Sequence, residues 1–450
     1  MRTRAAPATS WGRPDELSQV GSAMPAVHFT NLLIVVAVGL IAPLALGFFP
    51  RVRLPAIVLE IVLGVVIGPS GLGWVKPDLP VSILALVGLA FLLFLAGLEF
   101  DIERLGGRFL SIAAAGFAVS FAIAIVLGLG LRVGGFVKSP LFAAIVLAAT
   151  SLGVIVPALE DSGSINSSLG QVVIAGSSFA EFGSIILLSL FFSGKRATST
   201  ASSLILLGGF GLVVLLVGLA IAGVERSMSL APVLQRLQDT TAQIRVRAAF
   251  VLLVGFTALA DKVGLETILG AFAAGALLVL IDRDQALTHP QFRVKLEAVG
   301  FGVFIPIFFV TSGVRFDSNA LFAGASTVAR VPLFLLAIYL ARGLPALIYT
   351  RLLGLRRSLL AGIFQSTSLP FIVAATQIGL GLSVVSRASA AALIAAGLLS
   401  VIISPTLGLL LLRRHEPRAA RGQELPRPVM PVITTDDTAL CRVNEVASAP

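Results

Sequence analysis

Residues 177–192 read SSFAEFGSIILLSLFF, and they place one carboxyl group, that of Glu181, inside an apolar stretch. No other charged residue lies between Ser162 and Gly194. This length and composition are typical of a helix that crosses a membrane. An ionised carboxylate is costly in hydrocarbon, so Glu181 must face water, hold a proton or pair with a cation. The stretch therefore predicts a membrane-spanning helix whose carboxyl group binds or moves ions.

The composition of the whole chain agrees with this interpretation. Of its 450 residues, 57% are hydrophobic and 12% are charged, and the mean hydropathy is +0.99. These values exclude an ordinary soluble domain. Apolar runs long enough to span a bilayer predict an all-α membrane protein with about thirteen transmembrane helices, the weakest at 264–281. The runs lie at residues 30–49, 54–71, 80–98, 109–131, 139–158, 169–193, 203–223, 244–260, 264–281, 297–314, 331–352, 358–380 and 387–412.

The chain divides into a polar N-terminal segment at 1–29, a membrane domain at 30–412 and a polar tail at 413–450. The N-terminal segment has neither the apolar core nor the cleavage site of a secretory signal peptide, so the first span is expected to direct membrane insertion. The tail is rich in Pro, Arg and small residues, which predicts disorder. Because Cys441 is the single cysteine, an intramolecular disulfide is excluded.

The distribution of Lys and Arg predicts the orientation in the membrane. Loops after odd-numbered spans carry thirteen of these residues and loops after even-numbered spans carry nine, and the tail adds six on the side of the first set. Positive residues favour the cytoplasmic side. The protein is therefore expected in the cell (inner) membrane, with its C-terminus in the cytoplasm and its N-terminus outside. The net charge of +10 is then explained by topology and by the lipid bilayer, and no nucleic-acid partner is expected.

Few side chains within the spans can titrate. The histidines, His28, His289 and His415, fall at span boundaries or in loops, so a buried proton carrier should be a carboxylate. Glu181 lies near the centre of its span, whereas Glu60 lies nearer the start of its own. Glu181 is therefore the first candidate and Glu60 a secondary carboxylate.

One deep cation, Arg342, lies in the run VPLFLLAIYLARGLPALIYTRLLG. A guanidinium in mid-membrane needs an anionic partner or a wet cavity. Glu181 is the expected partner. A purely structural ion pair between the two residues is the alternative interpretation.

Two spans are expected to be broken in mid-membrane, because polar side chains and helix-breaking residues meet there. The first, LFAAIVLAATSLGVIVPALED, contains Thr150, Ser151, Gly153 and Pro157. The second, LLAGIFQSTSLPFIVAATQIG, contains Gln365, Ser366, Thr367, Ser368 and Pro370. Discontinuous helices mark the binding sites of transporters, although simply kinked membrane helices also contain Pro and Ser. The broken span precedes the Glu181 span but follows the Arg342 span, and the sequence leaves the reason for this reversal open.

Three motifs resemble those of a known family. They are RLPAIVLEIVLGVVIGPSGLG at 53–73, FLLFLAGLEFDIERL at 91–105 and FIPIFFVTSGVRFD at 304–317. Together they resemble monovalent cation:proton antiporters of the second family, the Kef-type sodium/hydrogen exchangers, and the resemblance covers about residues 30–412.

This resemblance implies a sodium/proton-antiporter-like fold that is built on inverted repeats, with a dimerisation part and a mobile core part. The ion site would lie between two crossing broken helices, one containing Thr150 and Ser151 and the other residues 365–370. Glu181 falls where the family carries its essential aspartate, and Arg342 where many members have a lysine. A homodimer is expected and no cofactor.

Two departures from the family pattern affect the mechanism. Ala180 stands where some members carry a second acid, and the chain ends soon after Arg413 without a nucleotide-binding domain, so ligand gating of that kind is not expected. We expect Glu181 to bind a proton or a monovalent cation, Na+ or K+, in turn. Because neither Ala180 nor Arg342 can release a second proton, exchange is predicted to be electroneutral.

Other classes of protein fit parts of the same pattern. A cation channel or a non-transporting membrane sensor of the same fold remains open, although no repeated filter sequence occurs. An enzyme is not expected, because HExxH, GxSxG and GxxxxGK[ST] motifs are absent from the sequence.

Overall fold

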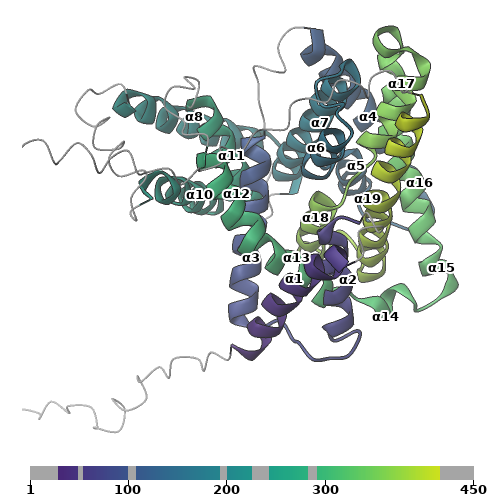
Figure 1. The fold of residues 1–450 in the computed structure, drawn as a ribbon, viewed down its shortest axis with the longest axis horizontal. Helices are drawn as coiled ribbons and strands as arrows, with labels where there is room; N and C mark the ends of the chain where they lie inside the picture. Colours follow the sequence, from purple (N-terminus) through teal and green to yellow (C-terminus); the bar gives the residue numbers. More distant parts are fainter. Residues whose placement is uncertain are drawn as a thin grey trace, which may run out of the picture. The chain divides into compact units, whose positions relative to one another are not determined.

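The computed structural model describes residues 29–48, 54–99, 108–192, 200–225, 243–281 and 291–415. All regular elements in these residues are helices (Figure 1). The predicted disorder of the tail concerns residues that lie almost entirely outside the described ones. The expected all-α class is confirmed.

The helices follow one another in two long series. The first series is α1 Thr30–Phe48, α2 Ala56–Ile67, α3 Leu79–Leu98, α4 Arg108–Val133, α5 Pro140–Ala148, α6 Leu152–Asp161, α7 Ser168–Phe192 and α8 Thr200–Glu225. The second is α10 Ile244–Val263, α11 Thr267–Ile281, α12 Gln291–Val299, α13 Ile305–Val314, α14 Ser318–Leu321, α15 Ala325–Val328, α16 Arg330–Gly343, α17 Thr350–Gln365, α18 Pro370–Gly381 and α19 Arg387–His415. A π-helical segment, Gly300–Phe304, joins α12 to α13. A 3-10 segment, Leu344–Tyr349, leads from α16 into the first residues of α17, and the chain kinks within α17 at Gly354, whose φ is 76°.

Helices α1, α2, α3, α10, α11, α12 and α13 pack together and are called the flanking group below. Asp78 caps α3 by accepting a hydrogen bond from Val81 N at 3.1 Å, and it also accepts one from Asn31 of α1 at 3.0 Å. Helices α3 and α11 approach closely, because a Cβ at Gly275 would overlap the carbonyl oxygen of Phe94. These contacts fix the start of α3 against α1 and its later turns against α11.

Helices α4 to α7 and α16 to α19 form the crossing group, in which two helices are broken. Helix α5 stops at Ala148 and α6 restarts at Leu152, and α17 stops at Gln365 and α18 restarts at Pro370. Each half therefore has an intact helix, a broken helix and a second intact helix. Glu181 lies on the last helix of the first half, whereas Arg342 lies on the first helix of the second half. The reversed order seen in the sequence arises because the two charges occupy non-equivalent helices.

Helix α7 connects the two groups. It packs against α11, where Phe182 and Phe272 stack with ring centroids 5.2 Å apart. A second contact between the two groups is a hydrogen bond of 3.1 Å, in which Gln377 of α18 donates to the hydroxyl of Ser312 on α13. The crossing group therefore meets the flanking group through a few side chains around α7 and α18.

Each run that was expected to span the membrane overlaps one helix, a broken pair of helices, or two helices joined by a π-helical or 3-10 segment. Among the described residues, nine helical segments are long and apolar enough to cross a membrane, and α2, α11 and α18 are shorter apolar helices. Helix α10 fills the run at 244–260 but carries charged residues near both ends. The count of thirteen crossings stays a prediction.

Candidate functional site

The two broken helices cross at their breaks. Ser151 N donates to Thr367 O at 2.8 Å, and the Thr150 hydroxyl donates to Gln365 O at 2.8 Å. Ala149 and Ser151 have extended backbone angles, which frees the peptide groups between α5 and α6 from helical hydrogen bonds. The segments predicted to be broken are thus joined directly, although they are far apart in the sequence.

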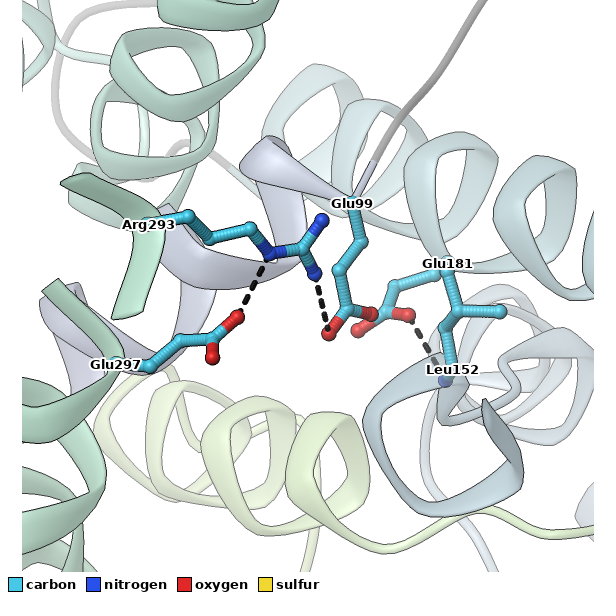
Figure 2. A network of polar contacts seen from close by, with 5 residues as sticks. All are labelled: Glu99, Leu152, Glu181, Arg293 and Glu297. Carbon is cyan, nitrogen blue, oxygen red and sulfur yellow. Dashed lines mark hydrogen bonds and ion pairs between the residues drawn. The ribbon is translucent and has the colours of Figure 1, made fainter. Parts of the chain in front are cut away.

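Glu181 lies beside the start of a half-helix. Its side chain is buried, at 8% exposure, and its Oε2 accepts a hydrogen bond from Leu152 N at 3.1 Å. Leu152 is the first residue of α6, so the carboxyl group meets the positive end of the helix dipole and one of the unpaired N–H groups found there. Figure 2 shows this contact. The geometry favours a negative charge at Glu181 without supplying a full counter-charge.

Arg342 lies at the C-terminal ends of two half-helices, α5 and α17. The residue is 2% exposed. Nε donates to Thr150 Oγ1 at 2.7 Å and to Gln365 O at 3.4 Å. Nη1 donates to Ser120 Oγ at 3.1 Å, and Nη2 donates to Gly176 O at 3.3 Å. Since Gln365 ends α17 and Thr150 follows α5, the cation lies where the half-helices present carbonyl groups and the negative ends of their dipoles.

The structure corrects the expected ion pair between Glu181 and Arg342. Within the described residues the guanidinium donates to hydroxyl and carbonyl oxygens, and the carboxylate accepts from a backbone N–H. The physical reason is that the crossing offers two different helix ends, so each charge is stabilised by a dipole end of opposite sign. The structural ion pair proposed as an alternative is likewise not formed.

The residues of the second break have different roles. Gln365 donates through Nε2 to Val172 O at 3.4 Å, and the Ser366 hydroxyl donates to Gly362 O at 2.7 Å. Pro370 is the first residue of α18, a position that suits its fixed φ. Thr367 and Ser368, in contrast, have buried hydroxyls without a hydrogen-bond partner. These two oxygens are free to bind a ligand.

Two more buried hydroxyls were not singled out in the sequence. Ser177 and Ser184 lie four residues before and three residues after Glu181, which places them on the same face of α7. Both are fully buried, and both hydroxyls lack a partner. Leaving such a group unpaired costs free energy, so they are candidate ligands of a cation. Their helical spacing from Glu181 is the sequence signal that could have found them.

Glu60 lies apart from the crossing. It is buried in α2, which packs against α1 and α13 of the flanking group. Among the described residues, no hydrogen bond joins it to either break. The structure therefore brings together Thr150, Ser151, Gln365, Thr367 and Arg342 by direct contact, with Glu181 attached through Leu152, and it leaves Glu60 outside this set.

Two crossing broken helices, with half-helix ends directed at buried charges, define the class of secondary transporters with inverted repeats. Residues 35–412 match the family described as "Sodium/hydrogen exchanger, transmembrane". The chain belongs to this family, and it is a multi-pass membrane protein. Its assignment to the Kef-type branch stays a prediction.

Known relatives agree with this assignment. The Bacillus subtilis protein YjbQ is 30% identical over 403 residues, which are 86% of this chain and 63% of YjbQ. This chain thus spans less than two thirds of that relative. An Na+/H+ antiporter of Enterococcus hirae is 30% identical over 275 residues, 59% of this chain and 68% of the relative.

The fold also matches a solved structure. The sodium proton antiporter MjNhaP1 of Methanocaldococcus jannaschii superimposes with a TM-score of 0.60 and 17% identity, over 85% of this chain and 98% of MjNhaP1. At this identity the likeness concerns the fold alone. The expected fold class, including two crossing broken helices, is confirmed.

Proposed function

We propose that this protein is a secondary active antiporter that exchanges a monovalent cation for a proton, with Glu181 binding the two in turn. One observation carries the proposal: Glu181 is buried, and no cationic side chain among the described residues is bonded to it, because Arg342 is bonded elsewhere. A buried carboxylate without a counter-charge must take up a proton or a cation. Neutralisation by either one is the chemical basis of exchange.

The coupling follows from the same balance of charge. With a proton or a cation bound, Glu181 contributes no net charge, and the crossing group can change the side to which it opens. With neither bound, the carboxylate would carry an uncompensated charge through the apolar boundary. The empty form is therefore disfavoured, which prevents the cation gradient from being lost without proton movement.

Exchange of one cation for one proton fits the surroundings of Glu181. Arg342 stays protonated, since a guanidinium keeps its proton in proteins, and its donors are bonded to the crossing. Ala180 has nothing to titrate. The expected outcome is electroneutral exchange, which proteoliposomes can check: a current that follows a cation gradient would contradict it.

The nature of the cation is inferred from relatives and from the oxygens at the site. The Enterococcus hirae relative is named as an Na+/H+ antiporter, so Na+ is the first candidate and K+ the second. The candidate ligands are all oxygens, which suit hard cations: the Glu181 carboxylate and the unpaired hydroxyls of Ser177, Ser184, Thr367 and Ser368. Li+ serves as a useful third probe.

The remaining features of the proposal concern placement. We expect the membrane domain to span residues 30–412, with the N-terminus outside and the C-terminus in the cytoplasm of the cell membrane. A homodimer in the lipid bilayer, without a cofactor or nucleic acid, completes the proposal. A locked Glu181–Arg342 pair, which would favour a non-transporting sensor, is not found in the described residues.

The test is cation-induced proton movement in everted membrane vesicles, with Na+, K+ and Li+ added to the wild type and to Glu181→Gln. Exchange that is lost in Glu181→Gln supports the proposal and identifies the cation. Glu160→Gln removes an exposed acid at the end of α6 and serves as the matched control, which should exchange normally. Exchange that persists in Glu181→Gln would move the site, with Glu60→Gln the next variant, and a folded wild type without exchange would contradict antiport.

A further inference from the structure

A second carboxyl group, that of Glu99, lies near Glu181. Glu99 follows the last residue of α3, and its side chain is 18% exposed. Its Oε1 is 3.8 Å from Nη2 of Arg293, and its Oε2 is buried without a hydrogen-bond partner. Buried carboxylate oxygens are normally paired, so one side of this group is free to bind a cation.

The arginine that faces Glu99 is held more tightly by another residue. Arg293 Nε lies 2.7 Å from Oε1 of Glu297, one turn further along α12, whereas its contact with Glu99 is longer than a hydrogen bond. The Arg293 side chain is 54% exposed. Arg293 can therefore leave Glu99 and remain paired with Glu297 and with water.

The carboxyl groups of Glu99 and Glu181 lie close to each other, close enough for electrostatic repulsion between them (Figure 2). They come from different helix groups, since α3 belongs to the flanking group and α7 to the crossing group. The packing of α3 on α11, and of α11 on α7 through Phe272 and Phe182, brings the two carboxyl groups together. Two carboxylates at short range attract a cation that comes between them, because it relieves their repulsion.

We propose that Glu99 is a transient cation-binding residue, which receives the cation from one side of the membrane as it displaces Arg293 and then passes it to Glu181. This inference rests on the antiport function proposed above. Glu99 would supply, from another helix, a second acid that is missing at Ala180. Because Glu99 lies in the flanking group, it would not move together with Glu181 and the crossing group.

The action of Glu99 should be restricted to one side of the membrane. Alternating access moves one helix group against the other, so Glu99 can reach Glu181 only in the state that opens to its own side. The end of α3, where Glu99 lies, and the start of α12, where Arg293 lies, are on that side, which is the cytoplasmic side in the proposed orientation. Cations that arrive from the opposite side do not pass Glu99.

The experiment uses the full-length protein in proteoliposomes, with Na+, Li+ and K+ applied from each side in turn. Glu99→Gln should raise the KM for the cation on the Glu99 side about fivefold, the factor expected for one partly screened charge pair. The KM on the opposite side and the maximal rate should not change. Arg293→Gln should lower the KM on the Glu99 side, because the competing cation is removed.

The opposite signs distinguish this role from a structural ion pair. If Glu99 and Arg293 only held α3 to α12, both substitutions would change KM in the same direction and on both sides, and this result would overturn the inference. A rise in KM of equal size on both sides for Glu99→Gln alone would also overturn it, since it would report general surface charge. Normal KM values for Glu99→Gln in a protein that still needs Glu181 would reject the role of Glu99 alone, whereas a wild type without exchange would reject antiport itself.

Discussion

The two buried charges of the crossing differ in how completely the protein surrounds them. Arg342 donates to Thr150, Ser120, Gly176 and Gln365. Glu181 accepts a hydrogen bond from Leu152 N, and buried hydroxyls without partners lie on its own helix. The comparison teaches that one side of the crossing is saturated and serves to hold the breaks together, whereas the other side is left incomplete for a ligand.

The largest expected effect is a difference between the two charges: loss of the Arg342 charge should lower stability, and loss of the Glu181 charge should abolish transport. Arg342→Gln leaves several buried acceptors unpaired, so the free energy of unfolding should fall by about 3 kcal/mol. Glu181→Gln keeps an acceptor for Leu152 N, so it should abolish exchange while the protein unfolds at nearly the same temperature. Thermal unfolding in detergent, together with vesicle transport, checks both. A similar loss of stability in the two variants would break the comparison.

A second prediction concerns Thr150, which links the saturated side to both breaks. Its hydroxyl accepts from Arg342 and donates to Gln365 O, so Thr150→Val should lower the free energy of unfolding by about 1–2 kcal/mol. Ser151→Ala is the matched control, because Ser151 contacts Thr367 through its backbone N–H. Equal melting temperatures for Thr150→Val and Ser151→Ala would show that the hydroxyl bridge contributes little.

A third prediction sharpens the description of the incomplete side. Ser177→Ala and Ser184→Ala should raise the KM for the transported cation about threefold, the loss of one weak ligand, with stability unchanged or slightly higher because an unpaired buried hydroxyl is removed. Ser178→Ala is the control, since the Ser178 hydroxyl donates to Ile174 O at 2.9 Å. If Ser178→Ala raises KM as much as the other two, the free hydroxyls are not special.

The smallest expected effect is the pH dependence of Glu99, which lies just beyond the spanning residues of α3. Burial raises the pKa of the Glu99 carboxyl to about 7, the Arg293 guanidinium opposes this shift, and Glu297 and Glu160 add to it. Glu99 is therefore ionised above about pH 7 and neutral below it. Its attraction for the cation, to which Glu181 also contributes, is lost as the pH falls.

The measurement is the ratio of KM on the Glu99 side between Glu99→Gln and the wild type. This ratio should exceed one at about pH 8 and approach one at about pH 6. A ratio that stays constant across this range would show that Glu99 does not change its charge there.

Much of the fold could be predicted because the membrane imposes strict rules on the sequence. Every backbone polar group must be satisfied within the bilayer, so long apolar runs such as 169–193 become helices with nearly the predicted bounds. The breaks at Thr150 and Gln365 were predicted for the same reason, since polar groups and helix breakers are rare in such runs. The expected role of Pro157 was less accurate, because this residue lies inside α6 and the chain breaks before Leu152.

The candidate site could be predicted only in part. Glu181 and Arg342 were found because each is a rare charge in an apolar run, yet their pairing was wrong. Two charges in one membrane suggest an ion pair, but half-helix ends supply the alternative partners, and their positions depend on how the breaks cross. Ser177 and Ser184 could have been found from their spacing on α7, whereas no pattern in the sequence connects Glu99 with Glu181.

The sequence by itself determined the class of protein, its helices, the two breaks and the two buried charges, because burial in hydrocarbon makes every polar group conspicuous. The tertiary structure alone decided which groups meet. Arg342 binds the carbonyl ends of the half-helices, Glu181 binds the start of α6, and Glu99 approaches Glu181 from another helix group. These partnerships depend on the crossing of helices that are distant in sequence, and dipole ends and neighbouring charges act through space and not along the chain.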